Sequence, residues 1–276
     1  MKDTKVWLIT GASQGLGLAT VKYLLANGQT VIATTRDKSK FDSSVAGNVR
    51  SEVISLDLNS EDAVKAAIEQ IIQKYGRIDI LINNAGHGFV GAVEEANAEE
   101  IEQVMAINVH ATLRMIRYVL PFMRKAKSGH IINLSSMAGI ISSPGWGIYN
   151  ASKYAVEGFS EAMYHELKDL GIKVTIIEPG AFRTNFLDSS LTSAHTQIED
   201  YDATAGATRR RLAGNNGKQP NDPEKAAIEI YKVATMINPP LRLLLGHDAY
   251  NNAIKKIELL QSDFERMKNV TLSTGF

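Results

Sequence analysis

The sequence contains no cysteine. Disulfide bonds, thiolate metal sites and a cysteine nucleophile are therefore excluded. Its six histidines show no metal-ligand spacing, so we predict no metal site. A chain without cysteine suits a reducing compartment, and we expect the protein to be cytoplasmic.

Long apolar runs are absent as well. No stretch reaches the roughly 18 residues that a membrane-spanning helix needs, so we expect no membrane span. The apolar run after Lys5 is short, and a strand explains it better than a signal peptide does. Neither charge is in excess, because 30 Lys and Arg residues balance 30 Asp and Glu residues. We therefore expect neither a nucleic-acid partner nor attraction to an anionic membrane.

The 276-residue sequence does contain short apolar runs that alternate with helical patterns. The runs are continuous, as in strands buried on both faces of a sheet. One helix is expected over 15–27 and another over about 60–75, with Ser60 as its cap and Gly76 as its stop. The alternation predicts an α/β fold, a parallel sheet with helices on both faces. The seven expected strands are 6–9, 30–33, 53–56, 78–82, 131–134, 174–177 and 241–245.

Three further segments have helical patterns. The segment 98–127 is too long for one regular helix, and we expect Pro121 to interrupt it. A helix over about 149–169 should end at Gly171. Its apolar stripe consists of Ala151, Ala155, Phe159, Met163, Leu167 and Leu170. A last amphipathic stretch carries Ile254, Ile257, Leu260, Phe264 and Met267.

The segment 185–223 departs from the alternation of apolar runs and helical patterns, since it is polar and rich in glycine. Insertions of this length in compact domains are often lids or binding loops, and we expect a substrate lid here. It contains three successive arginines, 209–211. They either meet an anionic substrate or, as we prefer, form a solvated face of the lid.

A glycine-rich stretch, 10–17, lies between the first expected strand and the first expected helix. Its sequence is Thr-Gly-Ala-Ser-Gln-Gly-Leu-Gly. Glycines allow a tight turn and close backbone approach to a pyrophosphate, and the helix that follows offers free N–H groups and a positive dipole end. The alternative is a glycine-rich turn that binds nothing.

Four further motifs follow in a fixed order: Asn83-Asn84-Ala85-Gly86, then Ser136, then Tyr149 with Lys153, then Pro179-Gly180 with Thr184. With the glycine stretch, they resemble the classical short-chain dehydrogenase/reductase family over nearly the whole chain, 6–246. The resemblance implies a single Rossmann-type doubly wound domain over 1–276 and hydride transfer between a nicotinamide cofactor and a carbonyl or alcohol carbon. It also implies a homodimer or homotetramer that pairs through the helices holding Asn108 and Tyr149.

The end of the second strand bears on the choice of cofactor. Thr35 stands where relatives that use NAD place an aspartate, and Arg36 follows it. A guanidinium grips a 2′-phosphate, whereas a carboxylate repels it, so we expect NADP(H) rather than NAD(H). Asp37 complicates this, since it is able to pair with Arg36. By resemblance Asp57 binds the adenine; a strand-end cap is the alternative.

The resemblance places the cofactor against residues from the whole series of motifs. They are Gly11, Ser13, Gln14, Gly15, Leu16, Gly17, Arg36, Asp57, Leu58, Asn84, Ala85, Gly86, Tyr149, Lys153, Pro179, Gly180, Phe182 and Thr184.

Tyr149 and Lys153 are four residues apart on an expected helix, so they share a face. An ordinary tyrosine has a pKa of about 10, too high for a base at neutral pH. We expect the Lys153 ammonium, the helix dipole and an oxidised nicotinamide to lower the pKa of Tyr149 and make it the acid/base. The alternative is an amphipathic surface helix.

Ser136 and Asn108 complete the expected catalytic set. A Ser136 hydroxyl at a strand's carboxyl end is placed to stabilise a developing alkoxide. By resemblance Asn108 marks a helix kink whose freed carbonyl holds a water that links Lys153 to solvent; a solvent-facing Asn is the alternative. Side chains expected to line the substrate pocket, each equally able to be core, are His87, Phe89, Ile141, Trp146 and Phe186.

These expectations favour an NADP(H)-dependent reductase of ketones or aldehydes. The second hypothesis is an NADP-dependent dehydrogenase of a lipid-like alcohol of steroid or retinoid type. A third, from a different class, is a sensor that binds NADP without turnover, and it is disfavoured because Tyr149 and Lys153 are both present.

Overall fold

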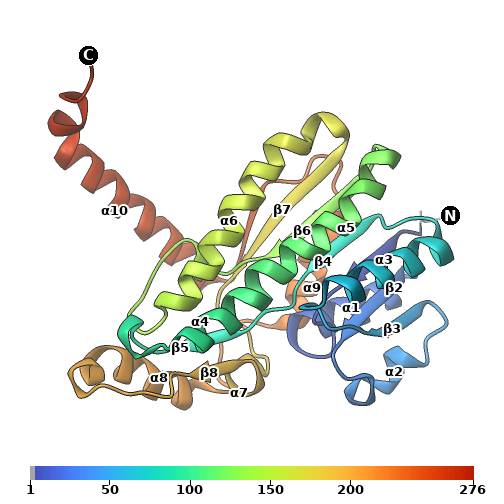
Figure 1. Cartoon of the computed structure of the whole chain (residues 1–276), viewed down its shortest axis with the longest axis horizontal. Coiled ribbons are helices and arrows are strands. Elements are labelled where there is room, and N and C mark those ends of the chain that lie inside the picture. Colours follow the sequence, from blue (N-terminus) through green and yellow to red (C-terminus); the bar gives the residue numbers. More distant parts are fainter. Residues whose placement is uncertain (1–3) are drawn as a thin grey trace.

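Seven parallel strands form the central sheet in the computed structural model, which describes residues 4–276 (Figure 1). Their order is β3-β2-β1-β4-β6-β7-β9. All seven expected strands exist, with ends that differ from the prediction by a few residues. The bounds are β1 Val6–Ile9, β2 Thr30–Thr35, β3 Ser51–Ser55, β4 Ile80–Asn83, β6 Gly129–Leu134, β7 Ile172–Pro179 and β9 Arg242–Leu245.

Helices cover both faces of this sheet, and each face has its own core (Figure 1). One face carries α1 Gly15–Ala26, α2 Ser43–Ala46 and α9 Pro223–Thr235. The other carries α3 Glu61–Tyr75, α5 Ala111–Ala126 and α6 Gly147–Leu167. Helix α4, Ala98–Met105, precedes α5 in the chain. The expected doubly wound α/β architecture is confirmed.

The continuous apolar runs are explained by this two-sided burial. Along β1, Leu8 packs into the core under α3 and α5, whereas Trp7 and Ile9 pack into the core under α1 and α9. Side chains alternate between the faces of a strand, so a strand covered on both faces needs apolar residues at every position.

Local signals set the ends of α3 as expected. The Ser60 hydroxyl accepts a hydrogen bond from the amide of Ala63, 3.2 Å away, and Gly76 ends the helix at a φ of 73°. That left-handed conformation favours glycine.

The expected break at Pro121 is wrong. Pro121 lies inside α5, which runs on to Ala126, and it is exposed. The carbonyl that loses its helical partner there therefore has access to water. The irregularity between α4 and α5 is instead a π-helical turn over Ala106–His110, which contains Asn108.

The apolar stripe proposed for α6 is also partly wrong. Ala151 is exposed and Leu170 is 38% exposed. The buried face carries polar side chains that find partners, such as Ser160, whose hydroxyl accepts a hydrogen bond from the Asn133 amide at 2.8 Å. Hydropathy alone places such a face incorrectly because hydrogen-bonded polar groups are buried without large cost.

The segment 185–223 is folded. It contains α7 Phe186–Ser189, β8 Leu191–Ser193 and α8 Ala207–Asn215. Strand β8 pairs in parallel with β5, Gly88–Val90, as a small second sheet that the sequence did not predict.

The chain ends in α10, His247–Leu272, which extends away from the rest of the molecule (Figure 1). Between residues 4 and 276, none of the helices combines the length and the apolar character needed to cross a membrane.

Candidate active site

The chain order reverses between β1 and β4, which are neighbours at the centre of the sheet. Parallel sheets of this kind bind ligands in the crevice beyond the carboxyl ends of the strands at such a point. The glycine-rich stretch follows β1, and the Asn84-Ala85-Gly86 stretch follows β4.

Two glycines of the first loop are required by close packing. Gly11 has a φ of 61°, and a Cβ there would lie 2.7 Å from the Cα of Ala85. A Cβ on Gly17 would lie 2.5 Å from the Asn84 side-chain nitrogen. Contacts below 3.0 Å force the backbone apart, so this loop needs both glycines.

Hydrogen bonds fasten the two loops together. The Asn84 amide donates to the carbonyl oxygens of Thr10, at 3.0 Å, and Gly11, at 2.8 Å. In return, the Thr10 hydroxyl accepts from the backbone amides of Asn84 and Ala85, both at 3.1 Å. Asn84 therefore holds the shape of the loop through the protein itself.

The start of α1 has the features of an anion site. Gln14 occupies the cap position but makes no side-chain cap to the helix, and the first turn carries no acidic residue. The Gln14 side chain instead donates to the hydroxyls of Ser189 and Ser190, at 2.9 and 3.0 Å. The free N–H groups at the start of this helix fit a pyrophosphate.

At the end of β2, Thr35 is 8% exposed and Arg36 is exposed. The Asp37 carboxylate accepts hydrogen bonds from the backbone amide and the hydroxyl of Ser39, at 2.9 and 2.6 Å. Asp57, after β3, accepts from the amide of Asn59 at 2.9 Å. The cap considered for Asp57 is therefore present, and its carboxylate is exposed at the same edge of the sheet.

Tyr149 lies at the start of α6, between two aromatic rings. Its ring centroid is 5.3 Å from that of Trp146 and 6.0 Å from that of Phe186. Burial raises the pKa of Tyr149 to about 12, and a hydrogen bond with Ser136 acts in the opposite direction. Within the chain itself, desolvation of the phenolate therefore outweighs the effect of its neighbours, and the lowering expected from Lys153, the helix dipole and an oxidised nicotinamide together stays a prediction.

Lys153 lies beneath this ring. Its ammonium is 5.7 Å from the Tyr149 ring centroid and donates a hydrogen bond to the carbonyl oxygen of Leu134 at 2.8 Å. Burial lowers the pKa of Lys153 to about 8, while the charge of Glu157 acts in the opposite direction. A Cβ on Gly86 would lie 3.6 Å from the ammonium, so the second loop also borders this lysine.

Asn108 is 1% exposed, so the solvent-facing alternative is wrong. Its side-chain oxygen accepts from the amide of His87 at 2.8 Å, and its nitrogen donates to the His87 carbonyl and to the Ser152 hydroxyl, both at 2.9 Å. The π-helical turn confirms the expected kink. The Asn108 carbonyl accepts from the Thr112 hydroxyl at 2.9 Å.

The loop after β7 borders the same crevice. A Cβ on Gly180 would collide with the carboxylate of Asp248. Asp248 accepts from the amide of Ala181 at 2.7 Å and from the Asn221 side chain at 2.8 Å. Thr184 lies over the glycine-rich loop, since a Cβ on Gly15 would lie 3.5 Å from the Thr184 Cβ. Sequence patterns did not point to Asp248 and Asn221, because their hydrogen-bond partners lie far away along the chain.

The expected pocket residues divide into two groups. Trp146 and Phe186 flank Tyr149, whereas Phe89 is 1% exposed and packs with Val104 and Ala194 as core. The His87 ring lies 3.1 Å from the Thr192 hydroxyl. Burial lowers the pKa of His87, and the charge of Arg36 adds to this.

The prediction that the three arginines form a solvated face is wrong for Arg209. Its guanidinium donates to both carboxylate oxygens of Glu95, at 2.6 and 3.2 Å. The Glu95 side chain is fully buried and also accepts from the backbone amides of Ala92 and Ile198. This ion pair fastens α8 to the turn after β5.

Comparisons with known proteins agree with this geometry. A family model described as short chain dehydrogenase matches residues 5–194. The chain is 38% identical to Oxidoreductase BOA17 of Botryotinia fuckeliana over 99% of this chain and all of that protein. It is 40% identical to the 3-ketodihydrosphingosine reductase of Bacteroides thetaiotaomicron over 88% of each chain. A crystal structure of a short-chain dehydrogenase from Streptomyces avermitilis matches over 100% of both chains, with a TM-score of 0.93 and 37% identity.

The chain therefore belongs to the short-chain dehydrogenase family, as the resemblance implied. It is an oxidoreductase that acts on CH–OH groups and their carbonyl counterparts.

Proposed function

We propose that this chain is an NADP(H)-dependent reductase of ketones or aldehydes in which Tyr149 donates the proton. The observation that carries this proposal is the environment of the Tyr149 hydroxyl. The phenol is buried between two aromatic rings, with the Lys153 ammonium 5.7 Å from its ring centroid, and burial raises its pKa, so the hydroxyl carries its proton at neutral pH. A proton donor is the form that carbonyl reduction requires.

The residues around the central crevice fit a dinucleotide. Gly11, Gly15 and Gly17 with the start of α1 would hold the pyrophosphate, and Asp57 with the amide of Leu58 would hold the adenine. Lys153 would hold the nicotinamide ribose, and the backbone of Pro179, Gly180 and Phe182 with Thr184 would hold the carboxamide. A bound nicotinamide supplies a hydride or accepts one.

The preference for NADP(H) is supported by the end of β2. Thr35 is neutral, and the exposed guanidinium of Arg36 follows it with no carboxylate at the position that would contact a ribose 2′-hydroxyl. A guanidinium offers two parallel donors to a phosphate, whereas NAD has no phosphate at that position.

Each catalytic side chain has its own role in the reaction at the substrate oxygen. The Ser136 hydroxyl donates a hydrogen bond to the carbonyl oxygen, and Tyr149 transfers its proton there as the alkoxide forms. Lys153, buried beside the phenol, stabilises the phenolate that remains. Asn108 holds the π-helical turn beside Lys153, where we place the route by which the proton is replaced.

For the substrate we propose an apolar ketone. Trp146 and Phe186 supply apolar walls beside Tyr149, and the segment 185–223 acts as the lid over them. The Bacteroides relative that matches over 88% of each chain is named for reduction of a ketone on a long-chain amine. Oxidation of a lipid-like alcohol by NADP is the second candidate, favoured by these same walls, because one set of residues serves both directions of the reaction.

A direct assay tests the proposal. Purified protein is mixed with NADPH or NADH and a panel of aromatic, long-chain and small polar ketones and aldehydes, and loss of the reduced nicotinamide absorbance is followed. We expect decay with NADPH and apolar ketones, and slower decay with NADH. In a second arm, NADP and a panel of alcohols are supplied and formation of NADPH is followed. A protein that binds NADPH tightly, but neither consumes NADPH with any carbonyl nor forms it with any alcohol, would instead be the NADP-binding sensor.

A further inference from the structure

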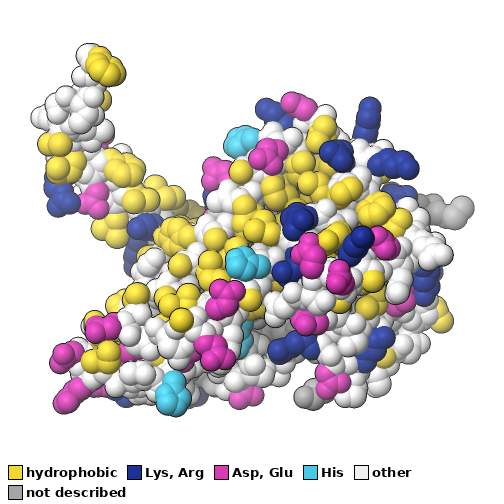
Figure 2. All heavy atoms as spheres, viewed as in Figure 1, with side chains coloured by type: hydrophobic (Ala, Val, Ile, Leu, Met, Phe, Trp, Pro, Cys, Tyr) yellow, Lys and Arg dark blue, Asp and Glu magenta, His cyan; other side chains and the backbone are white. Residues whose placement is uncertain are grey.

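Beyond its first turns, helix α10 takes no part in the proposed chemistry. It has 26 residues and is therefore about 39 Å long. Only its first turns pack against the body, where Ala249 and Ala253 are 0% and 3% exposed. From Ile257 to the end of the chain, every side chain is exposed. Figure 2 shows apolar side chains along this projecting arm.

Four exposed apolar residues of α10 are spaced in a seven-residue repeat. Ile257 and Phe264 are seven residues apart, Leu260 and Met267 follow each of them by three residues, and Tyr250 lies seven residues before Ile257. These spacings are those of the a and d positions of a coiled coil over two heptads. The exposed fractions of Ile257, Leu260, Phe264 and Met267 are 56%, 38%, 69% and 46%. We call these four residues the α10 seam.

A helix of this kind is expected to be covered. Isolated helices of about 20 residues are marginal in water, and most helical stability in proteins comes from packing of an apolar face. Soluble monomers also rarely expose large contiguous apolar patches. The Streptomyces structure matches this chain along its whole length, with a TM-score of 0.93, so the arm belongs to the shared architecture.

The charges on α10 argue against a lipid surface. A helix that lies on an anionic membrane carries an excess of Lys and Arg on its polar face. Between Tyr250 and Leu272, four basic side chains stand beside three acidic ones. Arg266 pairs with Asp263 at 2.8 Å and Lys268 with Glu265 at 3.5 Å. The polar face is therefore nearly neutral, as on the outside of a helix pair.

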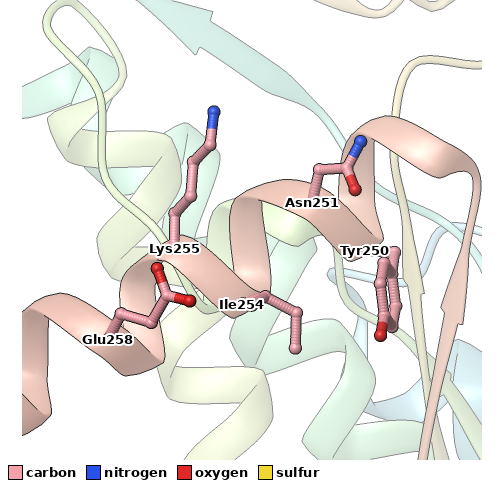
Figure 3. A pocket seen from close by; sticks show the side chains of 5 residues that line it. All are labelled: Tyr250, Asn251, Ile254, Lys255 and Glu258. Atoms are coloured by element: carbon pink, nitrogen blue, oxygen red, sulfur yellow. The ribbon is translucent and has the colours of Figure 1, made fainter.

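The base of the arm provides room beside the seam. Tyr250, Asn251, Ile254, Lys255 and Glu258 line a shallow open hollow of about 360 Å³ (Figure 3). Tyr250 and Ile254 project from one side of the helix, whereas Asn251 and Lys255 point to the other (Figure 3). An apolar strip thus continues from the seam toward the body of the molecule.

We propose that the α10 seam is covered by the α10 seam of a second copy of this chain. The repeat is typical of a helix that pairs with another helix. The nearly neutral polar face means that two copies of α10 do not repel each other. A two-fold symmetric pair needs only one self-complementary surface. The pairing adds to any contact made through α5 and α6. It does not depend on the proposed chemistry.

Two exposed leucines next to each other allow a matched test. Leu260 belongs to the seam, whereas Leu259, 61% exposed, lies about 100° away around the helix. We compare the double variant L260D/F264D with L259D/V270D, which adds the same charge off the seam. Molar mass is measured by light scattering during size-exclusion chromatography, and carbonyl reduction is measured in parallel. We expect the seam variant to halve the mass of the wild-type assembly and the off-seam variant to leave it unchanged.

Because the chain has no cysteine, cross-linking gives a second measurement. L260C should be joined to a second copy by a short bismaleimide, and L259C should be joined much less. A monomeric wild type, equal effects of both double variants, or equal cross-linking of both cysteine variants would overturn the proposal. So would binding to phosphatidylserine vesicles that only L260D/F264D abolishes while the mass stays constant. Loss of the dimer with intact turnover keeps this proposal separate from the proposed reaction.

Discussion

The ammonium of Lys153 lies 5.7 Å from the ring centroid of Tyr149, and both side chains are buried. Burial favours the neutral form of each group. It raises the pKa of the Tyr149 phenol to about 12 and lowers the pKa of the Lys153 ammonium to about 8. The site thus holds a protonated phenol beside a cation that is costly to bury.

The first prediction concerns the proton donor. Y149F should lower kcat by about 100-fold or more, because proton transfer to the carbonyl oxygen is lost. Binding of NADPH, measured by its fluorescence, should persist. Y154F is the control, since Tyr154 lies on the same helix but is 40% exposed and donates to the carbonyl of Ile140. Unchanged turnover in Y149F, with coenzyme still bound, would contradict the proposed function.

The second prediction concerns the cost of burying Lys153. Its pKa is lowered from 10.5 to about 8, so between these pH values the unfolded chain binds more protons than the folded one. Stability therefore rises with pH across this window, and the full cost applies below pH 8. K153M should be more stable than wild type at pH 7, by about 2 kcal/mol after allowing for the lost hydrogen bond to Leu134, although it is inactive.

The difference in unfolding free energy between K153M and wild type should shrink as the pH rises from 8 toward 10.5. Urea unfolding at several pH values measures it, with K168M, at an exposed lysine after α6, as the control. A K153M protein that is less stable than wild type at pH 7 would show that the buried charge is compensated.

The third prediction tests the choice of coenzyme. R36A should raise the KM for NADPH by about 10-fold, since a charge-assisted hydrogen bond contributes about 1.5–3 kcal/mol, and should leave the KM for NADH unchanged. K38A removes a nearby exposed charge and should affect neither. Equal losses with both coenzymes would place Arg36 away from the 2′-phosphate.

The fourth prediction compares two helical glycines. G17A should abolish coenzyme binding and lower the melting temperature, because the added Cβ would lie 2.7 Å from the carbonyl oxygen of Gly11. Gly214, inside α8, has nothing within 4 Å of the corresponding Cβ. G214A should stabilise the protein by about 0.5–1 kcal/mol. Thermal unfolding with and without NADPH distinguishes the two, and a G17A protein that is still stabilised by NADPH would contradict the packing argument.

The fifth prediction concerns the ion pair that fastens α8. R209M leaves the buried Glu95 carboxylate without its cation, so the melting temperature should fall by several degrees and the KM for an apolar ketone should rise. The Arg209 hydrogen bond lowers the pKa of Glu95 from 4.5 to about 2. The stability from this pair is present above pH 4.5 and is lost as the pH falls toward 2. R211M, at an exposed arginine two residues further on, should change neither quantity.

The sequence alone determined the strands, the limits of α3 and the spacing of Tyr149 and Lys153, because each depends on local periodicity or on a local cap. Only the tertiary structure decided the rest. Glu95 forms an ion pair with Arg209, which is 114 residues away in the sequence, and Asn108 accepts a hydrogen bond from the backbone amide of His87, 21 residues away. Strand β8 pairs with β5. The direction of the Tyr149 pKa belongs with these, because it depends on how completely Trp146, Phe186 and their neighbours exclude water, and burial is a property of the packed chain rather than of any segment.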